Sequence, residues 1–331
     1  MRDDAAASAA PLPSVSVVIP TRGGRERLRR VLPPLLASPV EEVVVVVDGL
    51  RDGSLELMQE LAAADTRLKP LYVEQQGPSA ARQHGVEHAT GDLVLLLDDD
   101  ILVSPHLVEG HARRHVDANG LVVLGYTPTV TPTPRRPGDV AVFLYARDYE
   151  RGFTALARDP SLVLRKLWGA NVSLRRSDCL RVGLRSPAFP ERYHEDREFG
   201  LRCLKAGLIG VFDPRLEAEH LYTRTVNGFL ADARAQGAGV YLVHRLHPDV
   251  LGPLASEAFE DGLPAAARLV LRACRRAPVR AMSVGVFRIL LTLSGQARLY
   301  SLETILAQLL RRIEQQHGAL QAARTSSPHA E

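Results

Sequence analysis

The sequence predicts an α/β fold with a mostly parallel central sheet, flanked by helices and followed by a helical C-terminal extension. Short β-branched runs alternate with helix-length amphipathic segments as far as about Tyr126, which is the succession expected of βαβ units. The runs at 43–47 and 93–97 are apolar throughout, as in strands that are covered on both faces. Beyond about Tyr222 the chain is rich in Arg and Leu and follows a helical pattern.

The elements of the predicted sheet follow in a regular order. The expected strands are 14–19, 42–47, 68–73, 93–97 and 121–124, and the expected helices are 25–37, 54–64, 78–89 and 105–116. Pro78 and Pro105 suit the first turn of a helix, where the missing amide hydrogen has no partner to lose. Pro33-Pro34 is expected to kink the first helix or to end it early. His111 and His115 share one face of the last helix, which we interpret as solvated and Arg-rich.

The chain divides into five expected segments. We expect a disordered leader at 1–13, two halves of one α/β domain at 14–126 and 127–225, a helical extension at 226–316 and a flexible tail at 317–331. The leader is Ala-rich but lacks the apolar region of a signal peptide. The apolar stretch 281–295 is short for a membrane span and holds Arg288, so we do not expect it to cross a bilayer.

Composition excludes some classes of protein. Hydrophobic residues make up 46% of the 331 residues, and 41 Lys and Arg against 38 Asp and Glu give a net charge of +3. A charge this small gives no support for nucleic-acid binding. The 3 cysteines are odd in number and far apart, which fits a reducing cytoplasm better than a disulfide framework or a cysteine metal site.

Residues suited to phosphates and metals follow the predicted strands. Open parallel sheets bind ligands at the carboxyl ends of their strands. The first strand is followed by Pro20-Thr21-Arg22-Gly23-Gly24, the second by Asp48 and the fourth by Asp98, Asp99 and Asp100. Three consecutive carboxylates repel one another, and a divalent cation that carries phosphates commonly relieves this repulsion. The alternative interpretation is a solvated acidic turn that caps the following segment.

In order and spacing, these pieces resemble the family-2 glycosyltransferases of the GT-A fold, whose sheet is Rossmann-like. The matching stretches are Val17-Val18-Ile19-Pro20-Thr21, Val47-Asp48-Gly49, residues 77–82, Gly91-Asp92 and Leu97-Asp98-Asp99-Asp100. Two later stretches are similar to the acceptor-side segment and the Glu-Asp motif of the family. They are Trp168-Gly169-Ala170-Asn171 with Arg175-Arg176, and Phe189-Pro190-Glu191 with Glu195-Asp196 and its following helix. The resemblance runs from about Ser14 to Tyr222.

The resemblance implies a metal-dependent enzyme that moves a sugar from a nucleoside diphosphate donor to an acceptor hydroxyl, with inversion. Residues 14–126 would bind the nucleotide sugar and 127–225 the acceptor. Asp196 would be the catalytic base, with Glu195 as its neighbour and competitor. Asp98 and Asp100 would hold Mn²⁺ or Mg²⁺, with His220 as a further ligand. The implied donor contacts are Pro20, Thr21, Arg22, Asp48, Arg82, Asp98, Asp99, Trp168, Gly169 and Asn171.

Two positions depart from the family pattern. The family often has Asp-Asp-Gly-Ser after its second strand, whereas here a single Asp precedes Gly49 and the Gly-Ser pair is displaced to Gly53-Ser54. Where the family frequently has another Asp after the Glu-Asp motif, Glu198 stands. The contacts to the base of the nucleotide and to the acceptor are therefore less well specified than the metal contacts.

Other classes of protein remain as alternatives. His84-Gly85-Val86-Glu87-His88 matches an inverted zinc-peptidase pattern, but it lies in a segment that the family resemblance already places on a helix. A phosphatase of the haloacid type would carry its Asp-x-Asp after the first strand. A nucleotidyltransferase of related fold would need a Gly-rich loop with Arg and Lys after the first strand, which residues 21–25 match in part. A non-catalytic protein that binds nucleotide sugars or membrane surfaces is a further alternative.

The expected partners are a nucleotide-sugar donor, most commonly of UDP, and an acceptor hydroxyl that a lipid could carry. A basic stretch in the C-terminal region, with Arg268, Arg272, Arg275, Arg276 and Arg280 beside apolar residues, is typical of helices on anionic membranes. A helix packed on the protein with a solvated Arg face is the alternative. We expect a cytoplasmic protein, with a peripheral position at the inner face of the membrane as the further hypothesis.

Overall fold

The structure is a computed structural model that describes residues 11–49, 52–189 and 193–326. The chain forms two compact units. The first contains residues 1–127, 168–184 and 203–219, and the second contains 128–167, 185–202 and 220–331. Most of the expected leader, the end of the expected tail and the Pro190-Glu191 pair lie outside the described residues.

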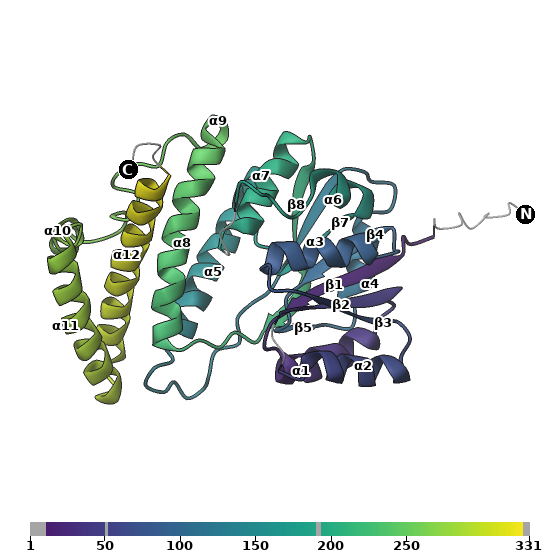
Figure 1. The fold of residues 1–331 in the computed structure, drawn as a ribbon, viewed down its shortest axis with the longest axis horizontal. Coiled ribbons are helices and arrows are strands. Elements are labelled where there is room, and N and C mark those ends of the chain that lie inside the picture. Colours follow the sequence, from purple (N-terminus) through teal and green to yellow (C-terminus); the bar gives the residue numbers. More distant parts are fainter. Residues whose placement is uncertain (1–10, 50–51, 190–192, 327–331) are drawn as a thin grey trace, which may run out of the picture. The chain divides into compact units, whose positions relative to one another are not determined.

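The first unit is built on one eight-stranded sheet of order β3-β2-β1-β4-β7-β6-β8-β5 (Figure 1). The strands are β1 (Val15–Thr21), β2 (Glu42–Asp48), β3 (Leu68–Val73), β4 (Leu93–Leu97), β5 (Ile101–Val103), β6 (Leu121–Tyr126), β7 (Asn171–Arg175) and β8 (Ile209–His220). β3, β2, β1 and β4 pair in parallel, and β7 is antiparallel to both β4 and β6. All five predicted strands are present, which confirms the α/β class and the mostly parallel sheet.

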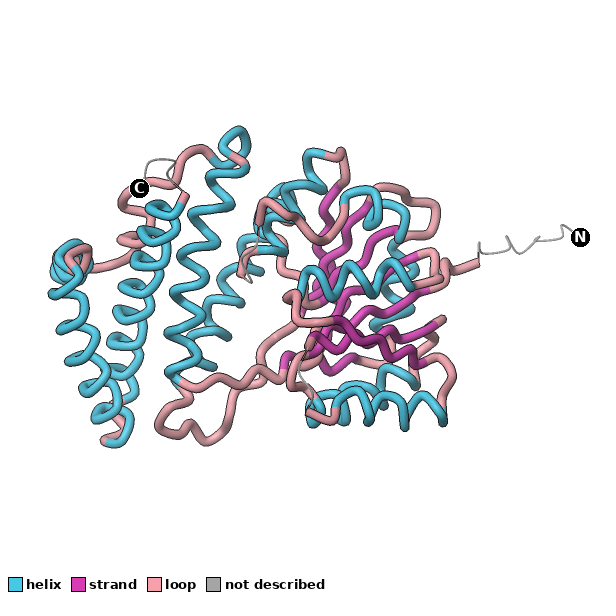
Figure 2. The backbone as a smooth tube through the Cα atoms, viewed as in Figure 1, coloured by secondary structure: helices cyan, strands magenta, loops and turns pink. Residues whose placement is uncertain are grey.

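Helices cover both faces of this sheet (Figure 2). On one face, α1 (Arg25–Leu36), α2 (Ser54–Ala64) and α4 (Leu107–Arg114) share a buried core with alternate residues of β1, β2 and β4. On the other face lie α3 (Pro78–His88) and α6 (Arg176–Val182). A Cβ atom on Gly85 of α3 would lie 2.5 Å from Val18, so only glycine permits this close approach of α3 to β1.

The proline pair does not end the first helix, because α1 continues through Pro33-Pro34 to Leu36. Each proline removes the amide that would bond to the carbonyl of the fourth residue before it. Those carbonyls belong to Arg29 and Arg30, which are both exposed, so water can bond to them. Leu35 is buried in the core, and its burial favours keeping this turn helical.

The prediction of a solvated face for His111 and His115 is wrong, because both side chains are buried in the first unit. His111 Nδ1 lies 2.7 Å from the Ser173 hydroxyl and Nε2 lies 2.8 Å from the Asn171 amide oxygen. His115 Nε2 lies 2.9 Å from the same hydroxyl. Burial lowers the pKa of both histidines to about 4. Their partners belong to β7, a strand that the sequence analysis did not predict.

We expect the free energy of unfolding to decrease as the pH falls from about 6.5 to about 4. In this window the unfolded chain binds protons on His111 and His115 that the folded chain excludes. A depression of this size is worth on the order of 3 kcal/mol per histidine. Urea titrations across the window measure the slope. His115→Gln should make the slope shallower, whereas His106→Gln, at an exposed position, should not. Equal slopes in both variants and the wild type would contradict this origin.

The second unit is helical. Its helices are α5 (Val140–Arg158), the short 3₁₀ turns η1 (Pro160–Leu162) and η2 (Leu164–Lys166), most of α7 (Glu195–Lys205), α8 (Val226–Leu246), α9 (Pro248–Leu251), α10 (Ala265–Ala273), α11 (Ala277–Gln296) and α12 (Tyr300–Thr325). α8 and α12 meet through glycine, since a Cβ on Gly237 would lie 1.8 Å from the carbonyl oxygen of Gln315. α12 continues to Thr325, so much of the expected tail from 317 is helical. Its Ala, Leu and Gln residues favour helix.

Candidate active site

The carboxyl ends of β1, β2 and β4 lie at the same edge of the sheet, because these strands are adjacent and parallel. Thr21 ends β1, Asp48 ends β2 and Asp98 directly follows β4. Leu97 of β4 pairs with Asn171, so the antiparallel β7 begins at this edge. The first unit therefore brings most of the predicted donor contacts to one edge of the sheet.

The three consecutive aspartates have different surroundings. Asp98 forms an ion pair with Arg82 of α3, and 34% of its side chain is exposed. Asp99 is buried, and its Oδ2 accepts a hydrogen bond of 2.6 Å from Thr21 Oγ1. Arg27 donates to both oxygens of Asp99, at 2.9 and 2.8 Å. Asp100 is half-buried. Asp99 is thus fixed by β1 and α1, and it stands between two more accessible carboxylates.

The charge of Asp99 is balanced within the protein. Burial raises the pKa of its carboxyl, while the hydrogen bonds from Arg27 and Thr21 act in the opposite direction. A buried carboxylate that receives a forked guanidinium and a hydroxyl has little capacity left for a ligand. These bonds fit a role for Asp99 in orienting the acidic loop, and the direct donor contact that the resemblance implied stays a prediction.

Gly24 makes the Thr21–Asp99 hydrogen bond possible. A Cβ atom at position 24 would lie 2.1 Å from Thr21 Oγ1 and 2.3 Å from Asp99 Oδ2. Both distances are far below a van der Waals contact, and both partners are buried. From the sequence, this glycine belongs to a loop suited to phosphates. The structure shows a further reason for a glycine at position 24: any side chain there would collide with the hydrogen bond that orients the acidic loop.

We expect Gly24→Ala to destabilise the first unit by about 1–3 kcal/mol, the usual cost of overpacking a tight site, and to weaken donor binding by displacing Asp99. Chemical denaturation and nucleotide titration measure the two effects. Gly152→Ala is the matched control, because a Cβ at position 152 meets nothing within 4 Å. Wild-type stability and binding in Gly24→Ala would contradict the proposed role of this contact.

Asp48 holds a loop as well as ending a strand. Its Oδ1 accepts a hydrogen bond of 2.7 Å from the amide of Gln76, and its Oδ2 accepts one of 3.0 Å from the amide of Gly77. Arg22 reaches the same loop, where its guanidinium donates to the Gln75 side chain at 2.8 Å. This role of Asp48 could not be predicted from the sequence, because its partners are main-chain amides, which every residue type except proline provides.

The Trp168–Asn171 segment leads into β7 at the same edge. Trp168 is half-buried and packs against the core of the first unit, and Gly169 is buried. Asn171 is only 1% exposed, and its amide nitrogen donates to the carbonyl of Leu216 at 3.0 Å while its oxygen faces His111. The Asn171 side chain belongs to the buried histidine cluster. The donor contact predicted for Asn171 does not fit this position.

The residues of the Glu-Asp motif lie in the second unit. Glu195 and Asp196 form the first turn of α7, and both are half-buried. Glu198, the departure from the family pattern, is 3% exposed. It accepts hydrogen bonds from Arg202 at 3.0 and 2.9 Å and lies 3.3 Å from His247. Glu198 therefore fixes the helix whose first turn carries Asp196.

His220 also lies in the second unit, at the last position of β8. It is 5% exposed, and its ring centroid lies 5.2 Å from that of Tyr145 and 5.5 Å from that of Tyr222. The two tyrosine rings stack on each other at 4.1 Å. The role of His220 as a metal ligand stays a prediction.

The carboxylates of the acidic loop suit a hard divalent ion that is bound partly by the protein and partly by the phosphates of a substrate. Across residues 11–49, 52–189 and 193–326, no three His, Cys, Asp or Glu side chains are grouped to hold a metal. Mg²⁺ is usually bound by one or two carboxylates together with substrate phosphates, so Asp98 and Asp100 fit such a site. The zinc-peptidase pattern lacks a third ligand in the same described residues, and its two histidine rings lie 4.3 Å apart.

Residues 16–179 match the family described as Glycosyl transferase family 2. The validoxylamine A glucosyltransferase of Streptomyces hygroscopicus subsp. jinggangensis is 31% identical over 249 residues, which cover 65% of this chain and 58% of that protein. The glucosyl-dolichyl phosphate glucuronosyltransferase of Haloferax volcanii is 28% identical over 176 residues, 51% of this chain and 55% of that protein. The chain spans about a third or less of the length of three further glycosyltransferase relatives.

Proteins of known structure share this fold. The mannosyltransferase PcManGT from Pyrobaculum calidifontis, solved with GDP-Man and Mn²⁺, superposes with a TM-score of 0.59 and 18% identity, covering 96% of this chain and 89% of that one. GalNAc-T7, solved with UDP, GalNAc and Mn²⁺, gives a TM-score of 0.51 at 16% identity, covering 76% of this chain and 52% of that one. These likenesses confirm the GT-A fold.

Proposed function

Because residues 16–179 belong to glycosyl transferase family 2, we propose that the chain transfers a sugar from a nucleoside diphosphate donor to an acceptor hydroxyl, with inversion at the sugar carbon. The observation that carries the proposal is the acidic loop after β4. There Asp99 is held by Thr21 and Arg27, and Asp98 and Asp100 are its neighbours in sequence, at the carboxyl ends of the parallel strands where open sheets commonly bind ligands.

In this proposal, Asp98 and Asp100 hold Mn²⁺ or Mg²⁺ together with the donor diphosphate, and His220 is a further ligand. The bound ion would neutralise the charge that develops on the leaving nucleoside diphosphate. Arg82, held beside Asp98, would add positive charge near the phosphates. The remaining donor contacts are proposed for Pro20, Thr21, Arg22, Asp48, Trp168 and Gly169. UDP is the first nucleotide to test, and GDP is the second, since it is the nucleotide of the mannosyltransferase counterpart.

The proposed catalytic base is Asp196. An attacking hydroxyl becomes strongly acidic only as its bond to the sugar forms, so a carboxylate within hydrogen-bond reach can remove the proton in the transition state. Asp196 lies in the first turn of α7, a helix that its buried Glu198 joins to His247. Glu195 is the adjacent alternative.

A thermal-shift panel of nucleotide sugars, with and without Mn²⁺ or Mg²⁺, tests the proposed class. A ligand that binds only the folded state raises the melting temperature, and the increase grows with the logarithm of the ligand concentration divided by its dissociation constant. We expect at least one nucleoside diphosphate sugar to stabilise the chain, and only when metal is present. Stabilisation by free nucleoside triphosphates and sugar phosphates, but not by nucleotide sugars, would favour a nucleotidyltransferase. Donor binding without turnover across an acceptor screen would favour a non-catalytic binding protein.

We also propose that the chain works in the cytoplasm, peripherally at the inner face of the membrane, on a lipid-linked acceptor. The relative from Haloferax volcanii is named for a glucosyl-dolichyl phosphate acceptor, which supports this acceptor class. Of the basic residues predicted to meet the membrane, Arg272 and Arg275 pair with the buried Glu260. Arg268 and Arg276 are exposed and remain the candidates for contact with lipid phosphates.

A further inference from the structure

α11 is apolar on two opposite faces, but the protein covers only one of them. On the inner face, Leu291 is buried, and Val284 and Phe287 pack against the cores of the second unit. On the outer face, four large side chains are largely exposed: Met282 at 66%, Val286 at 48%, Ile289 at 63% and Leu293 at 55%. Their spacing of 4, 3 and 4 residues places them in one stripe of the helix, opposite the buried side.

Further exposed apolar residues lie on other elements of the same unit, α10 and α12 and the link between α11 and α12. We call this surface the α11 face, and it consists of Leu269, Met282, Val286, Ile289, Leu290, Leu293, Leu299, Leu302 and Ile305. Elsewhere in the described chain, the exposed large hydrophobic residues are only Leu12, Val130 and Ile209. Exposed apolar side chains that gather on neighbouring helices mark an interaction site, whereas scattered single residues do not.

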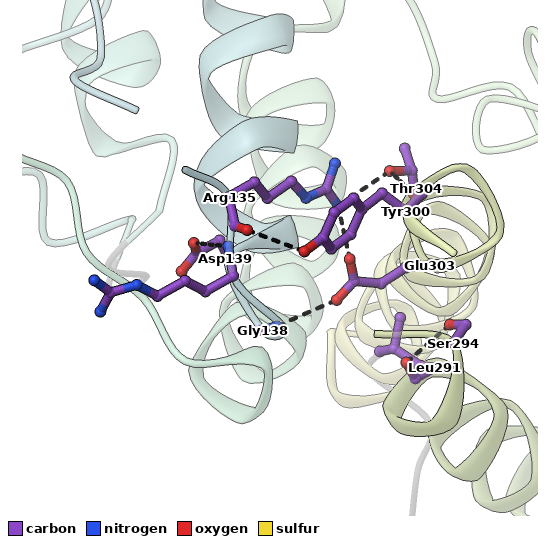
Figure 3. A network of polar contacts seen from close by, with 9 residues as sticks. Arg135, Gly138, Asp139, Leu291, Ser294, Tyr300, Glu303 and Thr304 are labelled. Carbon is purple, nitrogen blue, oxygen red and sulfur yellow. Dashed lines mark hydrogen bonds and ion pairs between the residues drawn. The ribbon is translucent and has the colours of Figure 1, made fainter. Parts of the chain in front are cut away.

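A network of polar contacts holds the start of α12, the helix beside α11 (Figure 3). Glu303 at the start of α12 is buried, and its two oxygens accept from Arg135 at 2.8 Å and from the amide of Gly138 at 3.2 Å. The Tyr300 hydroxyl donates to the carbonyl of Arg135 at 3.0 Å. These bonds tie the start of α12 to the segment before α5, and α11 packs on α12 through its buried side.

The surroundings of the α11 face are positively charged. Residues 262–302 contain no Asp or Glu. The same stretch contains the arginines Arg268, Arg272, Arg275, Arg276, Arg280, Arg288 and Arg298. An apolar face bordered by arginine is complementary to the interface of a bilayer that contains anionic lipids, where apolar side chains enter the acyl boundary and cations meet phosphates.

We propose that the α11 face is the surface by which this chain lies in the headgroup region of an anionic bilayer. The α11 face is thus the contacting surface for the membrane location proposed above. Membrane binding through this face does not depend on sugar transfer. The sequence alone predicts that the arginines around Arg272 make the contact with the membrane. In the structure, the apolar residues of α11 and the start of α12 supply the inserting part.

Two other occupants of the α11 face are less favourable. α11 is longer at both ends than the predicted apolar stretch 281–295, and by length and composition it could cross a membrane. Crossing would strip its inner face from the protein and bring Arg288 near the bilayer centre, which is costly. A second copy seated on the face would bring two arginine-rich, acid-free stretches together around a symmetric interface, where like charges repel.

Vesicle flotation of the full chain tests the proposal. We expect binding to mixed phosphatidylglycerol–phosphatidylcholine vesicles, weaker binding to pure phosphatidylcholine, and release as salt rises, because the arginine attraction is screened over about 8–10 Å. Ile289→Gln with Leu293→Gln should weaken binding by about tenfold or more, since two large apolar groups are lost from the bilayer. Arg268→Gln with Arg276→Gln should reduce the preference for anionic vesicles, because two of the exposed arginines are lost.

The matched controls are Ile209→Gln, at another exposed apolar position (61%) in the first unit, and Arg29→Gln with Arg30→Gln, a pair of exposed arginines on α1. Both should bind vesicles as the wild type does. Equal binding by Ile289→Gln with Leu293→Gln would overturn the proposal. Sedimentation equilibrium that shows a dimer broken by the same double variant would assign the face to a second copy. Nucleotide binding measured without vesicles keeps these outcomes separate from the proposed transfer activity.

Discussion

Replacing Asp196 with asparagine is expected to lower the rate of sugar transfer by about 10²–10⁴-fold, while the affinity for the donor stays near that of the wild type. Asparagine keeps the shape of the side chain and removes its basicity. The folded state should persist, because Asp196 lies in the half-buried first turn of α7, and the contact that joins this helix to His247 is made by the buried Glu198.

Glu195→Gln is the matched control for this variant. Successive side chains on a helix point about 100° apart, so both carboxylates are unlikely partners for one hydroxyl, and only one should be indispensable. If Asp196 merely caps α7, its loss would cost about 0.5–2 kcal/mol of stability and leave the rate of the folded protein unchanged. Melting temperature, donor binding and single-turnover transfer separate these cases. Wild-type turnover by folded Asp196→Asn would remove Asp196 from the role of base.

Asp100→Ala is expected to abolish the stabilisation that a nucleoside diphosphate gives in the presence of metal, with the fold intact. The substitution removes a hard oxygen ligand at a half-buried position, and a Mg²⁺ or Mn²⁺ site that takes only one or two carboxylates from the protein depends strongly on each of them. Thermal shifts with nucleotide, with and without Mn²⁺, measure the loss.

Asp92→Ala provides the control for Asp100→Ala. Asp92 is an exposed carboxylate just before β4, at the end of the strand opposite to Asp100, where it bonds to Ser14. Its loss should leave the metal effect unchanged. Donor binding with unchanged metal dependence in Asp100→Ala would show that the metal ligands lie elsewhere.

The parallel half of the sheet could be predicted from the sequence because its signals are local. Residues 43–47 of β2 and 93–97 of β4 are all apolar, which is the pattern typical of buried parallel strands. The acidic triplet was visible for the same reason, since three carboxylates follow one strand directly. What its members do was not visible, because Asp99 depends on Thr21 and Arg27, which lie 78 and 72 residues away.

The predictions from the sequence failed where the environment of a residue is set by a partner far away in the chain. The buried His111 and His115 looked solvated beside Arg113 and Arg114 because their partners stand on β7, some 60 residues later. The α11 face was missed for a related reason. A helix that is apolar all round is equally consistent with a core position and with a membrane contact, and only the packing of α11 shows which side the protein covers.

The central claim is that the chain releases a nucleoside diphosphate from a sugar donor with the help of a divalent ion. The most direct test is to follow, by mass spectrometry, the nucleotide product formed from the donor that the thermal-shift panel selects, in Mn²⁺, after chelation and after Mn²⁺ is restored. We predict nucleoside diphosphate in step with glycosylated acceptor, its loss on chelation and its return with the metal. Pyrophosphate or a nucleoside triphosphate as product, or turnover that chelation leaves unchanged, would contradict the claim.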